Sequence, residues 1–115
     1  MSAEELSKLL EKARVPHSSE EEMQSALVKF LTGKVEFKRE YRFSKRDIVD
    51  FLVADGIALE CKTKGQPLAI HRQLERYAEH EEVKGIVLFT SVHMGVKEKI
   101  NGKPAFKVQC GKAWL

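Results

Sequence analysis

The chain has 115 residues, of which 43% are hydrophobic and 32% charged, and its formal net charge is +3. This balance is typical of one globular domain spanning 1–115, and it excludes extended disorder and a separate second domain. No apolar run approaches the roughly 20 residues of a membrane-spanning helix, and the first residues lack the layout of a secretory signal. Cys61 and Cys110 are too few for a disulfide framework or a four-cysteine zinc site, so we expect a reducing cytoplasm.

The charges are unevenly distributed along the chain. Residues 34–46 contain six basic residues against two acids, and residues 95–115 contain five lysines against one acid. The stretch 47–94 between them contains eight acids against five bases. Basic segments around an acidic centre suit a polyanion held near carboxylates, where bound cations offset the repulsion. Two solvated basic edges of an ordinary protein would explain the same distribution.

Two helices are predicted before residue 34. Leucines recur at helical spacing over 3–13, and Val15-Pro16 ends this helix because a residue before proline avoids the helical conformation. Ser18 and Ser19 are suited to cap a second helix, which Gly33 closes. The stripe of this second helix that we expect to be buried comprises Met23, Ala26, Leu27, Phe30 and Leu31.

Strands dominate the rest of the pattern. Alternating, apolar and turn-forming stretches predict strands 35–43, 47–53 and 57–63, a helix over 67–82, strand 85–90, and a hairpin at 100–103 with a return strand over 105–109. Residues 92–99 fit a strand, a loop or a short helix equally well. The order α-α-β-β-β-α-β plus a hairpin predicts an α/β fold with a mixed sheet flanked by helices.

The polar end of strand 57–63 needs an explanation, because a buried strand should be apolar. Glu60 and Lys62 are two residues apart and therefore share one face of the strand. A three-residue loop over 54–56 with a left-handed glycine would place Asp50 directly opposite Glu60. A two-residue turn would instead bring Asp47 to that face. We prefer the first register because it groups Val49, Phe51 and Val53 with Ile57 and Leu59 in one core.

Two carboxylates directly opposite each other destabilise a sheet unless something neutralises them. Mg²⁺ or Mn²⁺ would do so, with oxygen ligands from Asp50, Glu60 and the backbone carbonyl of Cys61. Lys62 would then hold a phosphate or the attacking water beside the metal. The alternative is a Glu60–Lys62 ion pair on an exposed sheet with Asp50 solvated, since Asp…Glu-x-Lys also recurs by chance.

These residues resemble the PD-(D/E)xK nuclease superfamily, whose core is a helix, an antiparallel three-stranded meander, a helix and a parallel strand. The order of elements over 19–91 is similar to that layout. Asp50, Glu60 and Lys62 match the motif, with Val49 in place of the usual proline. Gln73-Leu-Glu-Arg-Tyr77 resembles the Gln-x-x-x-Tyr helix motif of the RecB-like branch, and the segment from residue 100 is similar to small phage-encoded nucleases of this superfamily.

The resemblance implies a restriction-endonuclease-like core, here with an added N-terminal helix and C-terminal hairpin. It implies that Gln73 orients the lysine or the water and that Tyr77 contacts a phosphate, the two side chains lying on one helical face. It also implies a metal-contacting acid on the first core helix. Among the glutamates at 20–22 we choose Glu20, nearest the buried stripe, because the other two suit the helix dipole. Glu40 is a weaker candidate for an indirect contact.

The activity implied is metal-dependent hydrolysis of phosphodiester bonds in DNA, as an endonuclease or an exonuclease. The basic residues expected along the DNA backbone are Lys38, Arg39, Arg42, Lys45, Arg46 and Arg76, joined by the C-terminal lysines. Because 115 residues leave little surface for gripping a duplex, we expect a homodimer, in the host cytoplasm if the protein is phage-encoded. The alternative is a non-catalytic nucleic-acid-binding or assembly module, which would have no reason to keep Asp50, Glu60, Lys62 and Gln73 together.

The other reactive side chains carry weaker signals. Cys61 points away from Glu60, so we expect a packed thiol rather than a nucleophile. His17, His71 and His93 have no ligand-spaced partners and are expected at the surface or in loops. Trp114 is expected to pack against the sheet or a neighbour.

Overall fold

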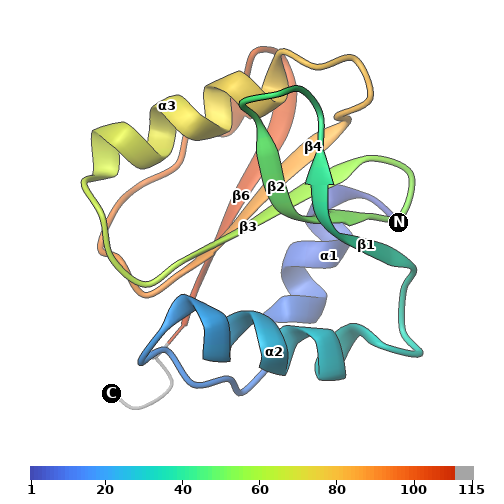
Figure 1. The fold of residues 1–115 in the computed structure, drawn as a ribbon, viewed down its shortest axis with the longest axis vertical. Coiled ribbons are helices and arrows are strands. Elements are labelled where there is room, and N and C mark those ends of the chain that lie inside the picture. Colours follow the sequence, from blue (N-terminus) through green and yellow to red (C-terminus); the bar gives the residue numbers. More distant parts are fainter. Residues whose placement is uncertain (111–115) are drawn as a thin grey trace.

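The computed structural model describes residues 1–110, which form a six-stranded mixed sheet with three helices (Figure 1). The helices are α1 (Ala3–Leu10), α2 (Glu20–Leu31) and α3 (Pro67–Ala78). The strands are β1 (Phe37–Arg42), β2 (Ile48–Val53), β3 (Ile57–Lys62), β4 (Gly85–Thr90), β5 (Lys99–Ile100) and β6 (Lys103–Gln109). The predicted α/β class is confirmed, and within the described residues no helix combines the length and apolarity needed to cross a bilayer.

The strand order across the sheet is β1-β2-β3-β4-β6-β5. The first three strands form an antiparallel meander, β4 lies parallel to β3, and β6 lies parallel to β4. Strands β5 and β6 form the predicted hairpin, in which Asn101 and Gly102 both adopt positive φ. The sheet is therefore mixed, with β3 in the middle joining the meander to the parallel part.

Two hydrophobic cores hold the layers together, one on each face of the sheet. Leu10 of α1 and Leu27 of α2 lie in the first core, whereas Leu74 of α3 lies in the second. Figure 1 shows α3 on one side of β3 and α2 on the other. Every residue of β4 is buried, as its continuous apolar run predicts, because helices cover both of its faces.

Two helices end earlier than predicted. Helix α1 ends at Leu10 rather than at 13, and α3 ends at Ala78 rather than at 82. In both cases an amide just after the helix donates to the carbonyl three residues earlier, from Ala13 to Leu10 and from His80 to Tyr77. This bond tightens the chain into a turn. Periodicity cannot show this, because the apolar spacing continues through a single tightened turn. Of the undecided stretch 92–99, residues 92–98 lie in neither a helix nor a strand, and Lys99 begins β5.

The turn between β2 and β3 has the predicted three residues. Val53 pairs with Ile57, and the Gly56 amide bonds back to the Val53 carbonyl at 3.2 Å. Gly56 has φ +139°, and a Cβ built there would collide with the carbonyl oxygen of Glu82. Glycine is therefore required at this position, and the turn sets the register of the site.

The face assignment of Val49 was wrong. Phe51 and Val53 lie in the core under α1 and α2, but Val49 lies in the core under α3. The alternation breaks at Asp50, where the paired rungs of β2 and β3 stop. The exposed Glu40, which lies beside Asp50 on β1, has a left-handed backbone with φ +46°. The β1–β2 pair therefore twists toward α3 at the row that contains Asp50.

Candidate functional site

Asp50 and Glu60 lie side by side, one residue beyond the last regular rung of β2 and β3. The Asp50 amide donates to Oε1 of Glu60 at 3.2 Å, and the Cys61 amide donates to Oδ2 of Asp50 at 2.8 Å. In a regular ladder these amides would bond to main-chain carbonyls. Carboxylates replace the carbonyls here, so each acid is anchored by the other strand. The predicted register and the meeting of the two acids are confirmed.

Lys62 lies on the same face as Glu60, with Nζ 3.5 Å from Oε2. The side chain of Glu60 is only 4% exposed, which excludes an ion pair on an exposed sheet. The side chain of Lys62 is 21% exposed and still reaches solvent. The ammonium therefore lies between the buried Glu60 carboxylate and the exterior, where a ligand could contact it.

The pKa values of Glu60 and Asp50 are both raised. Burial, followed by the neighbouring Asp50 carboxylate, raises the pKa of Glu60 to about 8 and outweighs the opposing effect of Lys62. Burial also raises the pKa of Asp50, against the Cys61 amide and Lys62, which lower it. The protein therefore carries an electrostatic cost in this pair at neutral pH that one lysine does not remove.

Helix α2 brings a third acid to the site. The helix begins at Glu20 because the Ser19 side chain accepts a hydrogen bond from the amide of Glu22. Oε2 of Glu20 accepts a hydrogen bond from the amide of Thr63 at 3.2 Å, just past the end of β3. The Glu20 charge also contributes, after burial, to the raised pKa of Asp50. Of the three glutamates that begin α2, Glu20 is the one that reaches β3.

The donor set fits a hard divalent cation. Within residues 1–110, no three His, Cys, Asp or Glu side chains are grouped as a ready metal site. Mg²⁺, however, keeps several waters and needs only one or two protein carboxylates. Asp50, Glu60 and the backbone carbonyl of Cys61 supply oxygen alone, and one lysine is the only positive charge paired with the two acids within residues 1–110. These residues fit Mg²⁺ or Mn²⁺, which would neutralise the pair.

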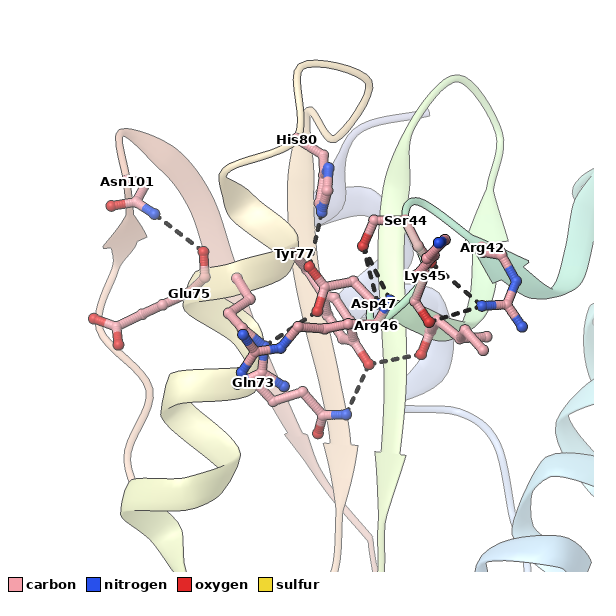
Figure 2. A network of polar contacts seen from close by, with 12 residues as sticks. Arg42, Ser44, Lys45, Arg46, Asp47, Gln73, Glu75, Tyr77, His80 and Asn101 are labelled. Carbon is pink, nitrogen blue, oxygen red and sulfur yellow. Dashed lines mark hydrogen bonds and ion pairs between the residues drawn. The ribbon is translucent and has the colours of Figure 1, made fainter.

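Gln73 and Tyr77 share one face of α3, as their spacing predicts (Figure 2). Nε2 of Gln73 donates to the Tyr77 hydroxyl at 2.8 Å, and that hydroxyl donates to the Ile48 carbonyl at 2.8 Å. Tyr77 has no exposed surface, so its predicted contact with a phosphate is wrong. Burial, followed by the Glu60 carboxylate, raises the pKa of Tyr77. Tyr77 therefore acts from inside the core, where its hydroxyl links Gln73 of α3 to the first residue of β2.

Sequence reasoning missed a polar cluster formed by Asp47, Arg76 and His80. Asp47 is buried, and its two oxygens lie 3.1 Å from Nε of Arg76 and 2.9 Å from Nε2 of His80 (Figure 2). The His80 ring also stacks on Phe43 with centroids 5.0 Å apart. Burial by itself raises the pKa of Asp47, but the bonds from His80 and Arg76 outweigh it and hold that pKa below its usual range.

This cluster fixes the end of α3 to the start of β2, three residues before Asp50. The i, i+4 spacing of Arg76 and His80 was the signal that could have found it. The Nε of Arg76 is committed to Asp47, which argues against the DNA contact expected of this residue. The cluster instead stabilises the strand that carries Asp50.

The other basic residues expected along DNA lie in different settings. Arg42 donates to the carbonyls of Ser44 and Lys45, and Nζ of Lys38 lies 5.6 Å from the centroid of the Tyr41 ring. Lys45 and Arg46 are exposed on the β1–β2 connection, which Figure 2 shows beside the end of α3. Arg39 lies between β1 and α2, where Nη2 donates to Gln24 at 3.0 Å. Arg39 is thus the one of the six whose side chain contacts α2, the helix that carries Glu20.

The remaining reactive side chains lie mostly as predicted. Cys61 is fully buried in the core under α1 and α2, and burial raises the pKa of its thiol. His17 and His93 are exposed, whereas His71 is half-buried on α3. Trp114 lies outside the described residues.

Comparison of the chain with protein-family models, with curated proteins and with solved structures found no match in any of the three. Its function must therefore be inferred from the chemistry of the site.

Proposed function

We propose that this protein is a metal-dependent deoxyribonuclease of the PD-(D/E)xK superfamily, RecB-like branch, on a restriction-endonuclease-like core. The observation that carries the proposal is the pairing of the half-buried Asp50 with the buried Glu60, with the Lys62 ammonium 3.5 Å from Glu60. The arrangement of α2, the antiparallel meander β1–β3, α3 and the parallel strand β4 supports this fold. Holding a buried and a half-buried acid together beside a single lysine costs stability. A ligand that binds this arrangement is the simplest reason for its presence.

Asp50, Glu60 and the Cys61 carbonyl would hold Mg²⁺ or Mn²⁺, which lowers the pKa of a bound water and polarises a phosphoryl oxygen. Lys62 binds a phosphate oxygen or the attacking water, and its charge offsets the negative charge that develops at phosphorus. Gln73, fixed through Tyr77, orients the lysine or the water. The protein itself thus contributes charged side chains whose positions are set before DNA binds.

The proposed substrate is DNA, and the partner is a second copy of the chain. Lys38, Lys45 and Arg46 are exposed on β1 and its following loop, where they can contact phosphates. A homodimer would double this basic surface and supply the second grip that a single small domain lacks. Because the contacts are electrostatic, DNA affinity should fall steeply as the salt concentration rises.

A cleavage assay at fixed salt tests the proposal. Purified protein is incubated with branched, linear duplex and single-stranded DNA in Mg²⁺, Mn²⁺ or EDTA. We expect metal-dependent cutting of at least one substrate, no cutting in EDTA, and loss of cutting in Asp50→Asn. Asp55→Asn, which changes an exposed acid in the β2–β3 turn, is the matched control and should cut normally. DNA binding without cutting in either metal would favour a non-catalytic module on this fold.

A further inference from the structure

We propose that Arg39 and Gln24 form a phosphate-binding subsite beside the catalytic acids, which holds a non-scissile phosphodiester of the DNA strand. The inference rests on the proposed nuclease function and names the residues that would align its substrate. The observation that carries it is an arginine on the strand next to Asp50 that α2 holds in place and that, within residues 1–110, has no carboxylate at ion-pair distance.

Arg39 lies on the strand next to the one that carries Asp50 and contacts the helix that carries Glu20. Arg39 pairs with Phe51 on β2, the residue after Asp50. Its Nη2 donates to Oε1 of Gln24 at 3.0 Å. Gln24 lies four residues after Glu20 on α2, so the two side chains share a helical face about 6 Å apart. Since Glu20 reaches the end of β3, the Arg39 guanidinium stands about one helical turn from an acid of the site.

The Arg39 guanidinium is already held in place before any ligand binds. The central carbon of the guanidinium lies 5.2 Å from the centroid of the Phe51 ring, and its Nη2 donates a hydrogen bond to Gln24. Arginine has five N–H donors in a planar fork that matches two phosphate oxygens, and Gln24 uses one of these donors. A fixed and exposed fork loses little conformational entropy when it binds a phosphate.

The charge of Arg39 remains free for an anion. Within residues 1–110, no carboxylate lies within ion-pair distance of Arg39, whereas Lys62 is paired with Glu60 and Arg76 with Asp47. A DNA strand that approaches Asp50 meets acids on β2, β3 and α2, so it needs a positive contact on each side. Lys62 supplies that contact on the α3 side, and Arg39 supplies it on the α2 side.

The test compares Arg39→Ala, Arg39→Lys and Gln24→Ala with wild type. DNA affinity is measured by fluorescence anisotropy in EDTA across a salt series, and KM and kcat are measured in Mg²⁺. For Arg39→Ala we expect a roughly tenfold or larger loss of affinity, a raised KM, and a kcat within about threefold of wild type. The slope of log K against log[salt] should fall by about 0.9, the value of one phosphate contact. Arg39→Lys and Gln24→Ala should give intermediate losses, because each keeps the charge and loosens the fork.

Arg42→Ala is the matched control, since it removes the same charge from the same strand three residues further on. It should change DNA affinity less than Arg39→Ala. Arg39→Ala with wild-type affinity, salt slope and KM would overturn the subsite and leave the nuclease proposal intact. If the wild type binds DNA in a way that depends on Arg39 but never cuts it, the nuclease proposal is overturned and the subsite is supported. Arg39→Gln, which keeps part of the aliphatic stem and a polar end group without the charge, repeats the comparison if Arg39→Ala melts early.

Discussion

Replacing Lys62 with alanine is expected to slow metal-dependent DNA cleavage by at least about 100-fold, the usual loss when one preorganised charge is removed from a transition state. The fold should survive, because Glu60 can take up a proton once its cationic partner is gone: burial and the neighbouring Asp50 already raise its pKa to about 8. The measurement is the single-turnover cleavage rate at saturating DNA, which separates chemistry from binding.

Lys64→Ala is the matched control for this variant. Lys64 lies two residues further along the chain and is exposed. The Lys64→Ala variant should therefore cut DNA within about threefold of the wild-type rate. Because the rate is measured at saturating DNA, any loss of affinity that follows from removing either lysine does not enter the comparison. Cleavage by Lys62→Ala at the wild-type rate would contradict the role given to the ammonium.

The metal-free protein is expected to lose stability as the pH rises from about 4.5 to about 8. These limits are the ordinary pKa of a glutamate and the raised pKa of Glu60, 4.5 and about 8. The folded carboxyl binds its proton more tightly than the unfolded one, so protonation stabilises the fold. This contribution to the free energy of unfolding is fully present below pH 4.5 and is lost as the pH rises to about 8. The slope is up to about 1.4 kcal/mol per pH unit. The raised pKa of Asp50 acts in the same direction.

Urea denaturation in EDTA across this pH range measures the effect. Glu60→Gln should flatten the dependence, and Glu79→Gln, which changes an exposed glutamate after α3, should keep it. Mg²⁺ should raise the stability of the wild type more at pH 8 than at pH 5, because the cation competes with the proton for the same oxygens. Equal stability from pH 5 to 8 in metal-free wild type would contradict the assigned environment of Glu60.

The parts of the site that were predictable follow from local geometry. The three-residue turn with Gly56 fixes which residue of β2 faces Glu60, and strand periodicity then sets Lys62 on the same side. Glu20 could be chosen among its neighbours because the helix cap at Ser19 and the buried stripe together define which way that helix faces. Each of these inferences spans only a few residues of chain.

The parts that were missed depend on contacts between distant segments. The face of Val49 depends on a break in the β2–β3 ladder, which forms only because carboxylates replace carbonyls at Asp50. Tyr77 is buried because β1 and β2 twist toward α3, and no spacing within α3 shows this. Asp47 is paired with residues 29 and 33 positions away. Such pairs become visible only when the fold is known.

The most direct test of the proposed site is to locate a bound cation in crystals of the protein grown near pH 8 with Mn²⁺. Anomalous diffraction at the manganese edge identifies the metal without reference to activity. We expect an anomalous peak in contact with Asp50, Glu60 and the Cys61 carbonyl, and its loss in Asp50→Asn. Manganese bound elsewhere, or no peak in protein that cuts DNA in solution with Mn²⁺, would contradict the site.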